Sequence, residues 1–584
     1  MALCKIRKLH GLLGLLATMS ALPVACGDKF EGCEASRTCP PPNDAGEGGE
    51  NGNTGGTSPS GGNTSGGTES GGTSGSSGTS GSGGLAGSDD GGAGAGGGSG
   101  DTEPPTVVSF TPSDGDSEIE RDVTLTIVMS EAIDPSTVTS TSVMLEGPNG
   151  RVPGFVHVEG NTISFAPDAP LILLATYTVT LSDAIADQAG NTLVKTQDAR
   201  FGVRDGKMSE LTYPFGSTTS RLATRLQSNA FGDAVVGMDL RPGLTNVHAS
   251  TYVAEDQRWT PATSLPGAHG YTLSVALDAS GRAAVAWGTT TTSFGWSRLT
   301  DDSQWVPAGA LPFWPSMAAT SSGRTFALTS DTMGLQSQTL DLSDGTVGSV
   351  DLVPFADLGS CADPVAARER VALICTRSLS SEQELIALWN IGSTWGPPER
   401  IASGVDFPSF RAGSDEQGNI VVVWREADEI RSRSYEYASG DWTPNQLLAT
   451  TSTIADVREL DITAGHAIVG VNSFEPTEGL WVMVYEPGSG WLETSKVRLD
   501  DPGTNGYNIT VSIDASGNGL AVWHSELRHR RYRANEGWQP VDNLGTNVEE
   551  YFLFAAGAPD GSVLVVANDL SQNPNGVPLA VRFE

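Results

Sequence analysis

The chain has 584 residues, a length that predicts three or four structural units rather than one core. It contains 69 acidic and 34 basic residues, which gives a formal net charge of −35 at pH 7. A field of that sign repels phosphate backbones and anionic lipid surfaces. The charge therefore argues against nucleic-acid binding and favours an exposed, soluble monomer.

Residues 1–25 have the layout of a signal peptide, with basic residues at positions 5, 7 and 8 before an apolar run over 9–25. That run is short for a membrane span and is interrupted by glycine and proline. The sequence Leu22-Pro23-Val24-Ala25 before Cys26 resembles the lipobox of bacterial lipoproteins, from which Pro23 departs. The resemblance implies a lipid on Cys26 that anchors the chain to a membrane.

The residue after this cysteine, Gly27, favours the outer membrane or cell surface over retention at an inner membrane, with a secreted or periplasmic location as the alternative. The cysteines agree with export, because four of them form two local pairs, Cys33 with Cys39 and Cys361 with Cys375. Cys-x-x-Cys spacing is absent, so we expect no metal and no cofactor. Residues 26–43 would form a short lipidated N-terminus with one of these pairs.

Residues 44–100 consist mostly of Gly, Ser, Thr and Asn and cannot bury enough apolar surface to offset the entropy of ordering. This segment is predicted to be a disordered linker. Short alternating runs follow within residues 101–204, at 106–110, 123–129, 142–145, 162–165 and 177–181, with turn residues between them. This spacing is typical of an antiparallel β-sandwich.

Several motifs within residues 101–204 resemble the bacterial Ig-like domain of SbsA-type surface-layer proteins. They are Ser109-Phe110-Thr111-Pro112, Ser130-Glu131 before Asp134-Pro135, Phe165-Ala166-Pro167, and residues 187–193 with the sequence Asp-Gln-Ala-Gly-Asn-Thr-Leu. The resemblance implies an Ig-like sandwich that serves as a spacer or adhesion module, and it names no active site. Asp114, Asp116 and Glu118 lie close together in sequence, but a solvated turn explains them better than a Ca²⁺ site.

Residues 207–584 contain an internal repeat of an Asp, a Gly three residues later and then an apolar strand, seen at 278–287, 415–424 and 514–523. Weaker copies are centred on Gly232, Gly323, Gly465 and Gly561, and one without glycine falls near Arg368. The eight centres are 42 to 52 residues apart. This period is typical of β-propeller blades, so we predict an all-β chain that ends in an eight-bladed propeller, with seven blades as the alternative.

Two further expectations follow from the repeat. The last unit is incomplete, and residues 209–215 supply an unpaired apolar run, so an N-terminal strand is expected to complete the last blade and close the ring. Cys361 and Cys375 lie symmetrically about position 368, which would place them opposite each other in a hairpin.

No catalytic signature is present, and we expect the chain not to be an enzyme. The Asp and Gly of the repeat differ in spacing from the sialidase box, and GxSxG, P-loop and zinc-protease patterns are absent. The recurring Asp and Trp residues are interpreted as turn and packing residues. One basic cluster, formed by Arg528, Arg530, Arg531 and Arg533, is a candidate anion-binding site, with pairing to nearby Glu526 and Glu536 as the alternative.

Three functions remain open at this point. The first is a surface binding or adhesion protein whose propeller recognises a glycan or a surface protein. The second is a propeller enzyme, such as a glycosidase or a lyase, with catalytic residues in unrepeated loops. The third is a structural scaffold of the cell envelope. Fold alone does not choose among them.

Overall fold

The computed structural model describes residues 100–584 apart from short gaps. The gaps are 195–197, 217–220, 230, 241–245, 289–293, 321–322, 332–333, 354, 356, 381, 392–393, 405–406, 408, 452–454, 474–478, 502–507, 524 and 572–575. Several predicted features lie outside the described residues. They are the signal peptide, the linker over 44–99, and the residues Cys26, Cys33 and Cys39. The described chain divides into two units, one ending at Asp205 and one running from Gly206 to Glu584.

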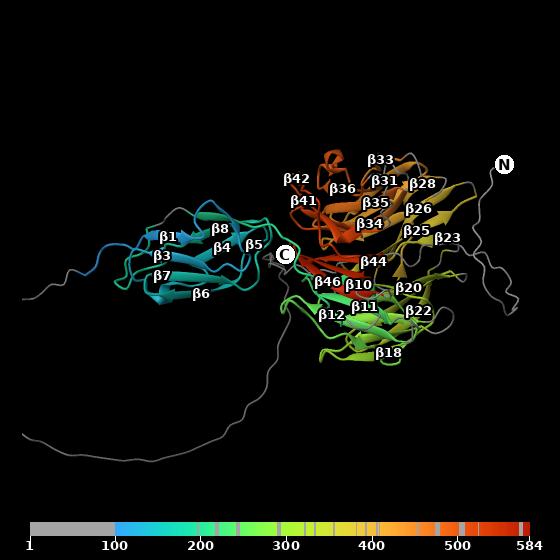
Figure 1. Cartoon of the computed structure of the whole chain (residues 1–584), viewed down its shortest axis with the longest axis horizontal. Helices are drawn as coiled ribbons and strands as arrows, with labels where there is room; N and C mark the ends of the chain where they lie inside the picture. The colour runs from blue at the N-terminus through green and yellow to red at the C-terminus, as the bar shows by residue number, and fades with distance from the viewer. Residues whose placement is uncertain are drawn as a thin grey trace, which may run out of the picture. The chain divides into compact units, whose positions relative to one another are not determined.

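The first unit is a sandwich of two sheets (Figure 1). In strand order, one sheet contains β1 (Val107–Thr111), β3 (Leu125–Met129), β7 (Thr162–Pro167) and β6 (Gly154–Glu159). The other contains β2 (Asp116–Ile119), β9 (Ala199–Val203), β8 (Thr176–Leu181), β4 (Val143–Gly147) and β5 (Gly150–Arg151). A short 3₁₀ helix, η1 (Pro135–Thr137), follows β3 and is capped by Asp134.

The alternating pattern of the sequence explains this sandwich. On β3, Leu125, Ile127 and Met129 are buried, whereas the residues between them are half-buried, because successive strand residues face opposite sides of a sheet. The buried residues join those of β4, β7 and β8 in one core. The five predicted runs correspond to β1, β3, β4, β7 and β8, whereas β2, β5, β6 and β9 were not predicted. The predicted β-sandwich is confirmed for this segment.

The second unit is built from eight successive sheets over residues 221–583 of the described chain. Sheet 1 contains β10 (Arg221–Ser228), β11 (Ala234–Leu240), β12 (Val247–Val253), β13 (Arg258–Trp259) and β14 (Thr263–Ser264). Sheet 2 contains β15 (Tyr271–Leu277), β16 (Ala283–Gly288), β17 (Phe294–Leu299) and β18 (Trp305–Leu311). Sheet 3 contains β19 (Ser316–Ala319), β20 (Arg324–Asp331), β21 (Gly334–Asp341) and β22 (Val347–Val353). Sheet 4 contains β23 (Leu358–Cys361), β24 (Val365–Ala367), β25 (Arg370–Ser378), β26 (Gln383–Ile391), β27 (Thr394–Trp395) and β28 (Glu399–Gly404).

The remaining four sheets repeat this order from an innermost to an outermost strand. Sheet 5 contains β29 (Phe410–Ser414), β30 (Ile420–Glu426), β31 (Glu429–Glu436), β32 (Asp441–Trp442) and β33 (Gln446–Thr450). Sheet 6 contains β34 (Ala455–Thr463), β35 (His466–Ser473), β36 (Gly479–Glu486), β37 (Gly490–Trp491) and β38 (Val497–Arg498), with the 3₁₀ helix η2 (Glu493–Ser495) between the last two. Sheet 7 contains β39 (Ile509–Ile513), β40 (Gly519–Trp523), β41 (Arg528–Arg533), β42 (Gly537–Trp538) and β43 (Asp542–Asn543), with the 3₁₀ helix η3 (Ser525–Leu527) before β41. Sheet 8 contains β44 (Val548–Gly557), β45 (Val563–Asp569) and β46 (Val577–Phe583).

The sheets form a closed ring, because the innermost strand of each sheet contacts the innermost strand of the next, and β44 of sheet 8 contacts β10 of sheet 1. Figure 1 shows these first and last sheets, in green and red, side by side. The segment before sheet 1 pairs with the outer edge of sheet 8, through the antiparallel bridges Met208↔Phe583 and Thr212↔Ala580. The predicted ring closure by an N-terminal strand is therefore confirmed, and so is the propeller fold.

The turn between the first two strands of each sheet needs a left-handed residue. Gly418 fills that position in sheet 5 with φ of 89°, which a residue without a Cβ adopts at little cost. In sheet 4, Arg368 has φ of 55° in the turn that lacks glycine. The same sheet contains the predicted disulfide between Cys361 and Cys375, which lie opposite each other in the ladder of β23 and β25.

Among the described residues there is no helix of the length and apolar character that a bilayer-spanning segment requires.

Candidate functional site

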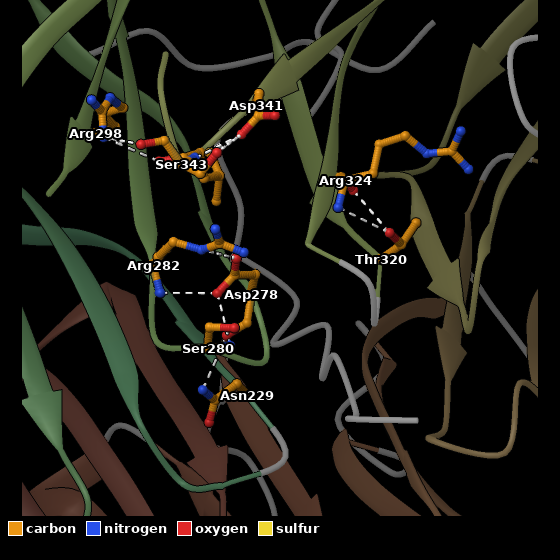
Figure 2. A network of polar contacts seen from close by, with 10 residues as sticks. Asn229, Asp278, Ser280, Arg282, Arg298, Thr320, Arg324, Asp341 and Ser343 are labelled. Carbon is orange, nitrogen blue, oxygen red and sulfur yellow. Dashed lines mark hydrogen bonds and ion pairs between the residues drawn. The ribbon is translucent and has the colours of Figure 1, made fainter. Parts of the chain in front are cut away.

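The carboxylates of the repeat aspartates accept hydrogen bonds from groups in their own turns. Asp278 accepts hydrogen bonds through Oδ1 from the backbone N–H groups of Ser280 and Arg282, each at 2.9 Å, and through Oδ2 from Arg282 Nε at 2.8 Å (Figure 2). Asp415 and Asp514 make the corresponding bonds to Asn419 and Asn518. Burial raises the pKa of Asp415, although its hydrogen bonds from Asn419 oppose that shift. These carboxylates therefore stabilise hairpins.

The same end of the ring carries contacts between neighbouring sheets. Asn229 Nδ2 of sheet 1 donates to the carbonyl oxygen of Asp278 in sheet 2 at 3.1 Å, which Figure 2 shows. Gly465 N of sheet 6 donates to Asp415 Oδ2 of sheet 5 at 2.8 Å. We call this the turn end of the ring. Its repeated polar groups bind one another, as expected for structural residues.

The tryptophans of the outer strands connect neighbouring sheets. Trp395 Nε1 donates to Ser337 Oγ of the preceding sheet at 3.0 Å, and Trp491 Nε1 donates to Ser432 Oγ at 2.6 Å. Trp442 Nε1 likewise reaches Glu399 of sheet 4 at 3.0 Å. Each indole also packs apolar surface, so these side chains serve packing between sheets.

The four arginines predicted to bind an anion lie on β41. Because strand side chains alternate, Arg528 and Arg530 lie on one face, and Arg531 and Arg533 lie on the other. Arg530 Nε donates to the carbonyl oxygen of Gln539 at 2.6 Å, and burial lowers its pKa. The structure therefore does not bring the four guanidinium groups to one place.

The second face of β41 is also engaged with protein groups. Arg531 is buried and lies 3.3 Å from Asp514 Oδ2, with its guanidinium 4.9 Å from the centre of the Phe583 ring. Arg533 pairs with Glu536 at 2.9 Å. Anion binding by this cluster stays a prediction, and the four groups already have partners within the protein.

Opposite the turn end is the loop end of the ring, where the second strand of each sheet leads into the third. Five arginines there form partly exposed ion pairs that differ from sheet to sheet. The loop-end ion pairs are Arg377 and Arg400 with Glu384, Arg431 with Glu426 and Glu429, Arg498 with Asp500, and Arg528 with Asp501 and Glu526. The hydrogen bond and charge of Asp501 raise the pKa of Arg528. The turn contacts repeat one arrangement in several sheets, whereas these ion pairs use different residues in each sheet.

The loop end of sheet 7 also contains an unusual backbone conformation. Glu526 and Leu527 are consecutive residues with φ of 59° and 50°, a region that side chains other than glycine seldom adopt. Leu527 is fully buried, and the Glu526 carbonyl accepts from the N–H groups of Leu544 and Gly545. These anchors hold the exposed carboxylate of Glu526 beside Arg528. Such strained positions often occur at functional sites.

A narrow hollow between sheets 7 and 8, lined in part by Asp514, Asn518, Arg531 and Ser562, has no room for a water molecule. Pockets for small ligands usually have 300–1,000 Å³. Asp514 already pairs with Asn518 and Arg531 there. The hollow is therefore too small and too internally bonded for such a ligand.

The first unit contains a cluster of three carboxylates that sequence reasoning missed. One oxygen each of Asp101, Glu131 and Asp187 lies within 4.8 Å of the others, and such oxygens suit a hard cation. Burial opposes ionisation of Asp187, but hydrogen bonds from Asn191 and Ala189 lower its pKa. The only sequence signal was that Glu131 and Asp187 both belong to motifs of the Ig-like resemblance. Of the triad Asp114, Asp116 and Glu118, Asp114 lies in a turn and the other two lie in β2, where Asp116 Oδ2 accepts a hydrogen bond from the backbone N–H of Ser113.

We expect Glu131→Gln to stabilise the first unit at neutral pH. Burial, together with repulsion from Asp101 and Asp187, raises the pKa of Glu131. The pKa of Glu131 is higher in the folded state than in the unfolded state, so its protonation favours folding at low pH. This stabilisation is fully present below the unfolded pKa and is lost as the pH rises through the folded pKa. Glutamine has no charge to lose, so the melting temperature should rise at pH 7 and depend less on pH. Glu159→Gln on exposed β6 is the control, and an equal gain there would contradict this explanation.

Comparison with known proteins assigns a family to part of the chain. Residues 101–203 match the family described as the bacterial Ig-like domain. The match supports the Ig-like prediction but does not separate an SbsA-type domain from other members. No curated protein matches the chain.

Solved structures resemble the chain at low identity. The propeller described as that of Dos1 has 9% identity, a TM-score of 0.43, and coverage of 65% of this chain and 95% of its own. The propeller of the Trilobed protease from Pyrococcus furiosus has 7% identity, a TM-score of 0.36, and coverage of 60% and 99%. The Aleuria aurantia lectin in complex with Fucα1-6GlcNAc has 14% identity, a TM-score of 0.28, and coverage of 47% and 96%. At these values the likenesses concern fold and not function.

Proposed function

We propose that the chain is an exported surface protein whose propeller binds a glycan or a surface protein at the loop end of the ring. The observation that carries the proposal is the difference between the two ends. At the turn end, the repeated aspartates and arginines bond to neighbouring sheets. At the loop end, the arginines form ion pairs that are partly exposed and differ among sheets.

Such groups suit the recognition of polar ligands. Guanidinium forks and carboxylates donate and accept hydrogen bonds in fixed directions, as sugar hydroxyls and peptide groups require. Arg528 donates to Asp501 at 2.9 Å and lies beside Glu526, whose carbonyl accepts from Leu544 and Gly545. A preorganised site loses less entropy on binding than a flexible one.

The proposed location rests on separate observations. The Ig-like segment and the Cys361–Cys375 disulfide support an extracellular or surface protein, since disulfides persist in oxidising compartments. We propose in addition that a lipid on Cys26 anchors the chain at the outer membrane. Mass spectrometry of the mature N-terminal peptide should detect an acylated Cys26, and an unmodified peptide beginning elsewhere would contradict the anchor.

The binding function can be tested with the purified full chain on a glycan array and on intact bacterial cells. For a ligand found there, we expect Arg528→Ala and Arg377→Ala each to weaken binding at least tenfold, through loss of charged hydrogen bonds. Arg258→Ala is the matched control, because Arg258 is an exposed arginine paired with Asp256 at the other end. Equal losses for all three variants, or no binding to either target, would contradict the proposal.

A further inference from the structure

Strand β22 (Val347–Val353) is the outermost strand of sheet 3 and has one unpaired edge. It pairs with β21 alone, and within the described ranges no strand occupies its other side. An edge strand turns alternate N–H and C=O groups outward, where another extended chain can bind them. The edge is seven residues long, which is enough for an added strand.

The other outer edges of the ring are shorter than β22, interrupted or covered. Strands β14, β38 and β43 are two residues long, and β18 contains Pro307, which cannot donate to a ladder. Strands β28 and β33 have six and five residues and begin after Pro397 and Pro444. In sheet 6 the 3₁₀ helix η2 interrupts the outer edge. The segment before sheet 1 covers the edge of sheet 8. Sheet 3 lacks both the tryptophan and the proline, and β22 runs over seven residues with one register shift, between Val347 and Val350.

The side chains of β22 are unusually apolar for an exposed strand. Val350 and Leu352 are two residues apart and lie on the same face, with 41% and 66% of their surfaces exposed. Asp351, also exposed, lies on the opposite face. An added strand would therefore meet two apolar side chains on one face and a carboxylate on the other.

The negative charge around β22 indicates that its partner is positively charged. Residues 325–367 contain six aspartates and no lysine, arginine, histidine or glutamate. Asp344 before β22, Asp351 within it and Asp357 after it are all exposed. A row of one sign attracts basic side chains and repels acidic ones.

We propose that the outer edge of β22 binds an extended segment of another protein by strand addition, and that this segment alternates apolar with basic residues. Backbone hydrogen bonds to the open edge supply affinity. Contacts with Val350 and Leu352 on one face and with Asp351 on the other supply selectivity. The inference concerns sheet 3 and does not depend on the function proposed for the loop end.

Two other occupants fit less well. A second copy of this chain would bring another acidic edge, and each copy has a net charge of −35. Residues 44–100 of the same chain contain six acidic residues and no lysine or arginine. Neither supplies the basic side chains that Asp351 and its neighbours favour.

The test uses the full chain and three immobilised eight-residue peptides, measured by biolayer interferometry at 150 mM salt. The first alternates valine with lysine, and the second alternates valine with glutamate. The third keeps the lysines but replaces alternate valines with proline, so that it has the charge without the ability to extend a ladder. We expect the valine–lysine peptide to bind at least tenfold more tightly than either of the others.

Variants then locate the binding edge. Asp351→Lys should weaken the valine–lysine peptide at least tenfold, and Val350→Thr with Leu352→Thr should weaken it without changing the charge. Ala310→Lys, at an exposed position of the outer strand β18, should leave binding unchanged, and the melting temperature of each variant verifies folding. Equal binding of the proline peptide, or an effect of Ala310→Lys as large as that of Asp351→Lys, would overturn the proposal. If the full chain self-associates and Asp351→Lys abolishes that association, the partner at β22 is a second copy of the chain, and the proposal is wrong.

Discussion

Replacing Phe215 with alanine is expected to lower the free energy of unfolding of the propeller by about 3–5 kcal/mol, the range for a buried phenylalanine. Phe215 is 1% exposed and lies in the segment just before sheet 1. Its ring centroid is 4.9 Å from that of Trp259 in sheet 1, and it shares a core cluster with Phe554 and Ala580 of sheet 8. The side chain therefore joins the two ends of the ring.

Guanidinium unfolding followed by tryptophan fluorescence measures this effect as a shift of the transition that belongs to the propeller. Phe231→Ala is the matched control, because Phe231 is 51% exposed and should change the free energy by no more than about 0.5 kcal/mol. Similar small effects of both variants would mean that the closing segment contributes little to the stability of the ring.

Removing the disulfide of sheet 4 is expected to cost about 3 kcal/mol, the value for a closed loop of this size. Cys361 and Cys375 are separated by 14 residues, and Cys375 is fully buried beside Leu373 and Ile386. The bond restricts the unfolded chain, and the unrestricted chain gains entropy when it is lost. The variant Cys361→Ala with Cys375→Ala should unfold at a lower guanidinium concentration than the oxidised wild type.

A reductant separates the loss of the bond from the loss of the side chains. Wild type in dithiothreitol should approach the stability of the double variant, whereas the double variant itself should not respond in the propeller transition. A wild-type protein equally stable with and without reductant would contradict the assigned contribution of this disulfide.

Much of the propeller was predictable because its signals are local. A turn aspartate, a residue with positive φ and an apolar strand follow one another within ten residues, so their spacing gives the period directly. The pairing of Cys361 with Cys375 was predictable for the same reason, since both flank one hairpin. In the first unit, five strands were found, whereas β2, β5, β6 and β9 were missed, although β6 alternates between half-buried and exposed residues.

Pairing of the β41 arginines with Glu526 and Glu536 was the alternative that the sequence offered, and both pairs form. The loop-end ion pairs between distant residues were not predictable from spacing. Arg400 reaches Glu384 because β28 and β26 pair in sheet 4, and Arg528 of sheet 7 reaches Asp501 in the segment that follows the last strand of sheet 6. The arginines of β41 show the opposite case. They form one cluster in sequence, but alternation along a strand places them on two faces.

The sequence by itself determined the all-β class, the Ig-like segment, the period of the ring, its closure and the disulfide, because each depends on residues close in the chain or on a repeated pattern. Only the tertiary structure decided which polar groups remain available. The carboxylates of the turn aspartates are bonded within their own hairpins, outer tryptophans donate to the preceding sheet, and no strand of the described residues covers the outer edge of β22. The contacts between sheets join residues about 45 to 60 positions apart, for which a single sequence contains no direct signal.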